Sequence, residues 1–188
     1  MIRDKILFRL NDYFDLLCLQ LIRKVFFALV GSKISISTRI PKMSINWPHQ
    51  LSIGCHCTLE DNLTFKYDSV WKKGPNILVG NHVFIGNNTE FNISERITIG
   101  HNSLIASNCR FVDHDHGMSN LKIPIRLQKA KTSPINIEEN VWIGTNCTIL
   151  KGVSIGKGSV IAAGSVLNKS VPPNEVWAGI PAKLIRKR

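Results

Sequence analysis

Two histidines alternate with two aspartates in one short segment of the 188-residue chain, Phe111–Met118, which reads FVDHDHGM. Imidazole titrates near neutral pH, so a histidine in such a cluster is suited to act as a general base. A neighbouring carboxylate can fix the tautomer of the ring and stabilise its protonated form. The segment is therefore the first candidate for a catalytic site, although a histidine here can also serve only as a corner residue of the fold.

Other chemistry has little support in the sequence. The chain has five cysteines, an odd number, and no CxxC pair, so neither a zinc site nor a disulfide framework is expected. No serine or cysteine stands in a nucleophile motif. Reduced thiols and the lack of a signal-peptide pattern favour a cytoplasmic protein. The cysteines are Cys18, Cys55, Cys57, Cys109 and Cys147.

The composition indicates a globular, basic chain. Hydrophobic residues make up 44% of the sequence, which excludes a disordered polar chain. The apolar runs are shorter than the roughly 18 residues needed to cross a bilayer. The net charge of +11 points to an anionic partner, either nucleic acid, acidic lipid or a phosphate-bearing ligand. Nucleic acid is disfavoured, because aromatic residues are few and are not interleaved with the basic ones.

A six-residue repeat, I-G-x-x-S-x, supplies the framework that must position the histidine cluster. Its second position is often glycine, its fourth is mostly asparagine or glycine, and its fifth is small or β-branched. Asparagine and glycine tolerate a positive φ, so we expect the chain to turn at every fourth position. The first positions are all large and apolar: Ile53, Leu59, Val79, Ile85, Phe91, Ile99, Ile105, Ile137, Ile143, Ile149, Ile155, Ile161 and Leu167.

The repeat predicts an all-β solenoid. Three corners close a coil of about 18 residues, and successive coils pair as parallel strands about 4.8 Å apart. We expect the solenoid over residues 35–171, with the first and fifth positions of each repeat pointing inward. The register is interrupted between Leu59 and Val79, between Phe91 and Ile99, and between Ile105 and Ile137. The last interruption predicts a long basic loop over about residues 115–134, and long loops on rigid scaffolds usually carry function.

Two end segments flank the solenoid. Residues 1–34 begin with thirty residues that contain neither proline nor glycine, which predicts an amphipathic helical segment. It either caps the open end of the solenoid, packs on a neighbouring subunit, or makes peripheral contact with a membrane surface. Residues 172–188 are expected to leave the coil and end as a basic tail.

Three motifs resemble the hexapeptide-repeat acyltransferases, and especially the galactoside and maltose acetyltransferases and the O-antigen and capsule acetyltransferases. They are DHDHG at residues 113–117, VWIG at residues 141–144, and a closing PPN…AGIPAK at residues 172–183. The resemblance covers about residues 79–186. It implies a left-handed parallel β-helix and a homotrimer whose active sites lie between subunits.

The resemblance also implies a reaction. The first histidine of the cluster, His114, would take a proton from a sugar hydroxyl as that oxygen attacks the thioester of acetyl-CoA, with no acyl-enzyme intermediate. Asp113, Asp115 or His116 would orient His114 or bind the acceptor. The galactoside enzymes have an N-F-N segment near the acceptor, where this chain has Glu90-Phe91-Asn92. Glu90 and Asn92 are therefore expected near the acceptor, with Glu90 as an alternative partner for His114.

Acetyl-CoA would lie along the last coils. The resemblance places its pantetheine arm in a groove along stacked corners, and its phosphates beside cations of the C-terminal segment. Lys183 and Arg186 occupy the matching basic positions. The remaining expected contacts are Trp142, Gly144, Thr145, Ala163 and Asn168.

Two alternatives remain open. The first is a metal-dependent enzyme like the carbonic anhydrases of the same fold, which would draw on His82, His114 and His116. The second is a non-catalytic scaffold that kept only the solenoid. An acetyltransferase requires no metal, so zinc content distinguishes it from the first alternative. The apolar N-terminal segment favours an acceptor made at the membrane, such as a surface-polysaccharide precursor, and hence a cytoplasmic protein at the inner face of that membrane.

Overall fold

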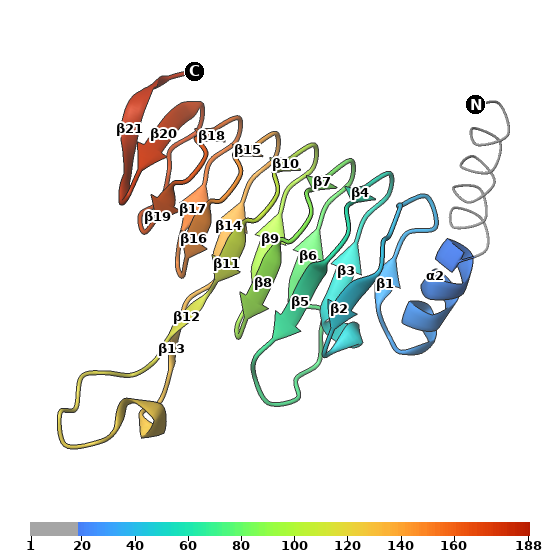
Figure 1. Ribbon diagram of the computed structural model, residues 1–188, viewed down its shortest axis with the longest axis horizontal. Coiled ribbons are helices and arrows are strands. Elements are labelled where there is room, and N and C mark those ends of the chain that lie inside the picture. Colours follow the sequence, from blue (N-terminus) through green and yellow to red (C-terminus); the bar gives the residue numbers. More distant parts are fainter. Residues whose placement is uncertain (1–18) are drawn as a thin grey trace, which may run out of the picture.

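The computed structural model describes residues 19–188, which form a stack of short strands with few helices (Figure 1). Sheet A contains β1 (Lys33–Ile34), β3 (Leu51–Ile53), β6 (Ile77–Val79), β9 (Ile97–Ile99), β14 (Ile135–Ile137) and β17 (Ser154–Ile155). Sheet B contains β4 (Thr58–Leu59), β7 (Phe84–Ile85), β10 (Leu104–Ile105), β15 (Trp142–Ile143), β18 (Val160–Ile161), β20 (Glu175–Gly179) and β21 (Ala182–Lys187). Sheet C contains β2 (Met43–Ile45), β5 (Leu63–Tyr67), β8 (Glu90–Ile93), β11 (Arg110–Val112), β16 (Thr148–Leu150) and β19 (Val166–Leu167).

From β3 to β19 the chain visits the three sheets in turn, apart from the segment between β11 and β14. Each strand pairs in parallel with the strand of the same sheet in the preceding coil, in a register that keeps repeat positions together. Ile105 lies beside Ile85 on one side and Ile143 on the other, for example. The prediction of an all-β chain built from parallel strands is confirmed.

The core is a column of first-position side chains. All thirteen are at most 5% exposed. Phe65, Phe91 and Phe111 stack on one another in sheet C, with ring centroids 4.8 Å apart at each step and nearly parallel planes. That spacing equals the usual distance between paired strands, so each ring lies directly over the next.

The corners follow the fourth position of the repeat, as expected. Nearly every residue in that column has a positive φ between 55° and 74°. The two exceptions are Ser94 and Ser170, which are absent from the positive-φ residues. The left-handed conformation explains the run of asparagine and glycine, because other residues adopt it at a cost.

All three register interruptions fall at the same edge of the stack, where sheet C passes to sheet A. We call this the C–A edge. Successive coils cross it through residues 46–50, 68–76, 94–96, 113–134, 151–153 and 168–170. The predicted loop leaves the stack here as an arm that starts with an antiparallel ribbon of β12 (His114–Asp115) and β13 (Lys131–Thr132), and it carries the 3-10 turn η3 (Ile125–Leu127) (Figure 1).

The N-terminal end of the stack carries α2 (Gln20–Leu29), with Phe27 packed inward and Leu29 81% exposed. The 3-10 turn η2 (Pro48–Gln50) follows β2. Of the helical segment expected over residues 1–34, the first eighteen residues lie outside the described part. No helix in residues 19–188 is long and apolar enough to span a membrane.

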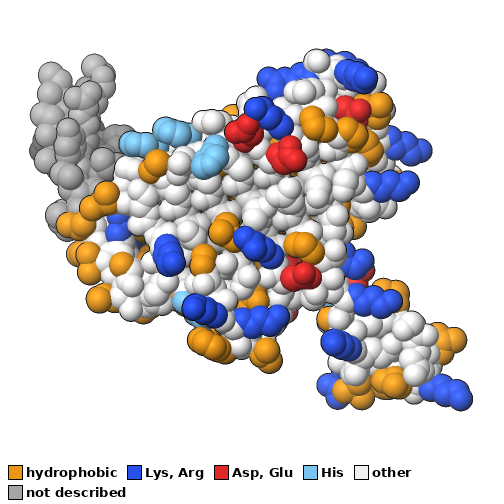
Figure 2. All heavy atoms as spheres, turned by 180° about the vertical axis from the view of Figure 1, so that it is seen from behind, with side chains coloured by type: hydrophobic (Ala, Val, Ile, Leu, Met, Phe, Trp, Pro, Cys, Tyr) orange, Lys and Arg blue, Asp and Glu red, His pale blue; other side chains and the backbone are white. Residues whose placement is uncertain are grey.

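The C-terminal segment is more ordered than the expected basic tail. Within residues 172–188, β20 joins sheet B beside β18, and β21 folds back on β20 as an antiparallel hairpin. Lysine and arginine side chains gather at this end of the stack and on the arm (Figure 2).

Candidate active site

Asp113 stabilises the 94–96 corner of the C–A edge through hydrogen bonds. Its carboxylate is fully buried, and it accepts hydrogen bonds from the backbone N–H groups of the neighbouring coil. Oδ1 accepts from Ser94 at 2.7 Å, while Oδ2 accepts from Glu95 at 2.7 Å and from Arg96 at 2.9 Å. These three bonds hold the 94–96 corner against the first residue of the DHDHG segment.

His114 is held through one ring nitrogen. Its Nδ1 lies 3.0 Å from Ser94 Oγ and 3.2 Å from Asp113 Oδ1. Ser94 Oγ donates its own proton to the carbonyl oxygen of Asp68 at 2.8 Å, so it accepts from His114. The neutral ring therefore carries its proton on Nδ1.

This tautomer leaves the lone pair of Nε2 available. Within residues 19–188, Nε2 has no hydrogen-bond partner, and the His114 side chain is 11% exposed. An oriented imidazole with a free Nε2 can accept a proton from a hydroxyl brought against it. The carboxylate beside Nδ1 stabilises the ring once it is charged.

The rest of the cluster lies at the root of the arm. Asp115 Oδ2 forms an ion pair with Lys151 Nζ at 2.7 Å, and His116 is exposed. Gly117 is buried so tightly that a Cβ there would lie 2.5 Å from the carbonyl oxygen of Lys129. The structure thus places the expected residues Asp113, His114 and His116 together, with only Asp113 inaccessible.

Glu90 and Asn92 lie on the outer face of sheet C, in β8. The structure pairs Glu90 with Arg110 of β11, not with His114. Asn92 Oδ1 is buried and has no hydrogen-bond partner among the described residues. The Asn92 amide therefore retains an unused hydrogen-bonding capacity.

Tyr67, at the end of β5, packs beneath the same edge. Burial raises the pKa of its phenol above the ordinary value, and the carboxylates of Asp113 and Glu95 add to that shift. Its hydroxyl accepts a long hydrogen bond from Asn76 Nδ2 at 3.4 Å. Tyr67 therefore remains a neutral structural group at neutral pH.

A groove of about 810 Å³ runs over the outer face of sheet B. Five of the seven expected cofactor contacts line it, namely Trp142, Gly144, Thr145, Ala163 and Arg186. The other two, Asn168 and Lys183, do not. Further lining residues that the sequence did not single out include Leu104, Val160 and Val176, and Arg188 of the basic C-terminal segment also lines the groove.

The floor of the groove is formed by closely packed coils. A Cβ on Gly144 would lie 2.6 Å from the backbone nitrogen of Ala163, so only glycine fits there. Beneath the floor, Cys109 Sγ donates to the carbonyl oxygen of Gly144 at 3.2 Å, and Cys147 Sγ donates to that of Ala162 at 3.1 Å. The interaction with the neighbouring Cys147 thiol, together with burial, raises the pKa of Cys109 above its ordinary value. Both residues are fully buried, so neither is placed to attack a bound thioester.

His82 lies away from the cluster, at the edge where sheet A passes to sheet B. Its ring stacks on that of His56 with centroids 5.1 Å apart. The structure therefore does not bring it to His114 and His116 within one chain. No group of three metal-ligating side chains occurs in the described part of the chain.

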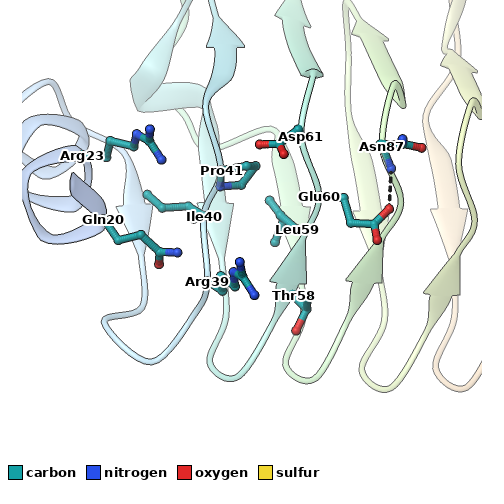
Figure 3. A pocket seen from close by; sticks show the side chains of 10 residues that line it. All are labelled: Gln20, Arg23, Arg39, Ile40, Pro41, Thr58, Leu59, Glu60, Asp61 and Asn87. Atoms are coloured by element: carbon teal, nitrogen blue, oxygen red, sulfur yellow. Dashed lines mark hydrogen bonds between the residues drawn. The ribbon is translucent and has the colours of Figure 1, made fainter. Parts of the chain in front are cut away.

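A second cavity, of about 370 Å³, lies between α2 and the first coils (Figure 3). It has walls of both charges, with Arg23 and Arg39 on one side and Glu60 and Asp61 on the other. None of the expected site residues lines it. It opens near the passage from sheet B to sheet C, on a different edge from His114.

Ser94 contributes to the surroundings of His114, and the sequence did not single it out as functional. Its signal was its place in the corner column, where asparagine or glycine is usual, next to a register interruption. Through its hydroxyl, Ser94 hydrogen-bonds both the carbonyl oxygen of Asp68 and the Nδ1 of His114.

Comparisons with known proteins identify relatives of this chain. Residues 134–169 match the family model for the bacterial transferase hexapeptide (six repeats). The chain is 43% identical over 100 residues to the putative lipopolysaccharide biosynthesis O-acetyl transferase WbbJ of Escherichia coli, which covers 50% of this chain and 51% of that protein. It is 35% identical over 141 residues to the galactoside O-acetyltransferase of the same organism, which covers 72% of this chain and 63% of that protein.

A solved structure extends the comparison to three dimensions. The hexapeptide-repeat acetyltransferase VCA0836 of Vibrio cholerae, complexed with acetyl coenzyme A, superposes with a TM-score of 0.60 at 26% identity, over 88% of this chain and 75% of that one. The chain spans only 51% and 63% of the lengths of the two curated relatives named above. The expected resemblance to hexapeptide-repeat acyltransferases is confirmed.

Proposed function

We propose that this hexapeptide-repeat protein transfers an acetyl group from acetyl-CoA to a hydroxyl of a sugar or of a surface-polysaccharide precursor. The observation that carries the proposal is the anchoring of His114, whose Nδ1 is tied to Ser94 and Asp113 while Nε2 keeps its lone pair. The names of the relatives, an O-acetyl transferase of lipopolysaccharide biosynthesis and a galactoside O-acetyltransferase, support the class of acceptor.

In the proposed mechanism, His114 Nε2 removes the proton of the acceptor hydroxyl as its oxygen attacks the thioester carbonyl. A new ester bond forms, the C–S bond breaks, and the leaving thiolate of CoA takes the proton back from His114. The buried carboxylate of Asp113, 3.2 Å from Nδ1, stabilises the transient imidazolium. Asp113 acts through His114 and does not contact the acceptor, while His116 and Asn92 remain the residues proposed to bind it.

The groove over sheet B fits acetyl-CoA in size and character. Its volume lies within the range of small-molecule sites, its walls are mainly apolar, and two guanidinium groups, Arg186 and Arg188, stand beside it. Guanidinium groups suit the phosphates of CoA. Trp142, which is exposed, and Thr145 would flank the pantetheine arm.

The active unit in this proposal is a homotrimer of left-handed parallel β-helices. His114 lies at the C–A edge, whereas the groove lies on the outer face of sheet B, and His114 does not line it. A thioester held in one subunit's groove would reach the His114 of a neighbour more readily than its own. A membrane-made acceptor would place the trimer in the cytoplasm, with α2 near the inner face of the membrane.

Replacing His114 tests the reaction. His114→Ala is expected to lower acetyl transfer by at least about 100-fold, the usual contribution of a general base, while acetyl-CoA binding and oligomeric state stay unchanged. Thiol release from acetyl-CoA, measured with a panel of sugars and glycan repeats, gives the rate. His101→Ala, at another edge, is the matched control. Near-normal turnover of His114→Ala, with loss in His116→Ala, would move the base to His116.

A further inference from the structure

The C–A edge carries a second elaborated crossing besides the arm, the segment of residues 68–76 between β5 and β6. At its tip Trp71 is 67% exposed, next to the exposed Val70, Lys72 and Lys73. We propose that Trp71 is a stacking platform for a more distant sugar unit of the acceptor, and that this subsite selects an extended, anionic glycan over a monosaccharide. The inference rests on the proposed acetyl transfer and specifies its acceptor.

The Trp71 platform is braced from behind. Its ring stacks on that of His49 with centroids 5.9 Å apart and planes 29° apart. His49 in turn packs edge-on against Trp47 at 5.7 Å. One face of the indole is thus occupied by a side chain of the preceding coil, and the other face remains for a ligand.

Hydrogen bonds fix the backbone of the segment. The carbonyl oxygen of Lys72 lies 2.9 Å from His49 Nε2 and accepts from Gln50 Nε2 at 2.6 Å. Gln50 is buried, and its Oε1 accepts from Asn76 Nδ2 at 2.8 Å. A site held in place before binding spends less free energy on ordering its side chains. These contacts therefore favour a prepared binding surface over a surface loop without a role.

The segment is connected directly to the proposed base. Its first residue, Asp68, accepts the hydrogen bond from Ser94 Oγ, the same atom that lies against His114 Nδ1. Strands β5, β8 and β11 are consecutive in sheet C, so the coils of Asp68 and His114 are two strand spacings apart, about 10 Å. Trp71 stacks on His49 of the preceding coil, so it lies one coil farther from His114 than Asp68 does. A single sugar ring at His114 cannot reach it, whereas an oligosaccharide lying along the C–A edge can.

The chemistry of the surface fits a charged glycan. The face of a sugar ring presents C–H groups that pack on the face of an indole. Tryptophan combines this large apolar face with a polar N–H, so it is suited to a binding surface that is open to water. Asp68 forms an ion pair with Lys66 at 3.0 Å, so the exposed cations Lys72 and Lys73 leave the tip with a positive charge. A carboxylate or a phosphate on the acceptor would complement them.

The test measures retention of the wild-type protein and its variants on immobilised glycans. The panel contains mono- to hexasaccharides in neutral, uronic-acid and sugar-phosphate forms. Wild type is expected to retain the longer acidic members over their constituent monosaccharides. Trp71→Ala is expected to weaken that retention about 10-fold, as loss of a central aromatic contact does, while Trp71→Phe keeps most of it. Val70→Ala, in the same segment and equally exposed, is the matched control.

The charge is tested separately. Lys72→Gln combined with Lys73→Gln should weaken binding of acidic members only, and the uronic-acid and phosphate arms identify which anion is preferred. Equal retention by wild type and Trp71→Ala, no preference for longer glycans, or no retention at all by wild type would each overturn the subsite. Failure of the proposed function looks different, because glycans would then be retained through Trp71 without any acetyl transfer.

Discussion

At the scale of single residues, the surroundings of His114 include a serine hydroxyl at a corner position where the repeat usually has asparagine or glycine. Ser94 stands where the repeat calls for asparagine or glycine, and its Oγ accepts a hydrogen bond from the Nδ1–H of His114 while donating one to the carbonyl oxygen of Asp68. An asparagine here would place an amide against His114 that has donors as well as an acceptor. The serine therefore restricts the ring to the tautomer that a general base needs.

Ser94→Ala tests this positioning role. We expect kcat to fall about 10-fold with little change in the KM for acetyl-CoA, because Asp113 still contacts Nδ1 but the ring loses its second anchor. Ser94→Thr, which keeps the hydroxyl, should restore most of the rate. A fall in thermal stability with unchanged kcat would show that Ser94 only holds the corner.

The two guanidinium groups of the groove permit a second test at this scale. Arg186→Ala should weaken binding of CoA by about 10-fold and binding of dephospho-CoA by much less, since a charge-assisted contact to phosphate is lost. Calorimetry on both ligands measures the difference. Lys187→Ala removes an exposed cation of the same strand that does not line the groove, and it should affect both ligands weakly. Equal losses for CoA and dephospho-CoA in Arg186→Ala contradict the phosphate assignment.

At the scale of elements, sheet C owes much of its stability to three stacked rings. Phe91 is fully buried between Phe65 and Phe111, at 4.8 Å from each. Its removal leaves a cavity in the middle of the column that neighbouring rigid coils cannot fill. The same sheet positions Ser94, Asp113 and His114 at its C–A edge.

Phe91→Ala should lower the free energy of unfolding by about 3–5 kcal/mol. Phe26 lies on α2 and is 57% exposed. Phe26→Ala removes the same kind of ring and should lower the free energy of unfolding far less. Urea denaturation followed by circular dichroism compares the two. Similar losses in both variants would mean that the column contributes no more than surface burial does.

The sequence predicts most of the regular structure and little of the irregular structure. Inward positions and corners follow from the repeat, because each six-residue repeat has room for one large inward side chain and one positive φ at fixed places. The ion pair of Glu90 with Arg110 and the stacking of Trp71 on His49 do not follow, because both join residues some twenty positions apart across coils. The structure also shows that all register interruptions lie at one edge, because each falls in a crossing from sheet C to sheet A.

At the scale of the whole molecule, the two halves of the proposed chemistry lie on different sides of the stack. His114 belongs to the C–A edge and the groove to the outer face of sheet B. In the proposed trimer, each complete site combines the base of one subunit with the groove of another.

Mixing two inactive variants tests this sharing. His114→Ala removes the base, and Ala163→Trp fills the groove at an exposed position. Each homo-oligomer should be inactive, while co-expressed mixtures should recover part of the acetyl transfer, because some sites then join an intact base to an intact groove. Light scattering gives the oligomeric state. A mixture as inactive as its components would place both parts of the site within one subunit.

Confining every insertion to the C–A edge has a consequence for how such proteins diversify. The coils beneath the groove leave no room for a side chain at Gly144, since a Cβ there would lie 2.6 Å from the backbone nitrogen of Ala163. The crossings at residues 68–76 and 113–134 lengthen without disturbing any strand pairing. In the proposed enzyme, changes in these two segments would alter the acceptor while leaving the coils that form the groove unchanged.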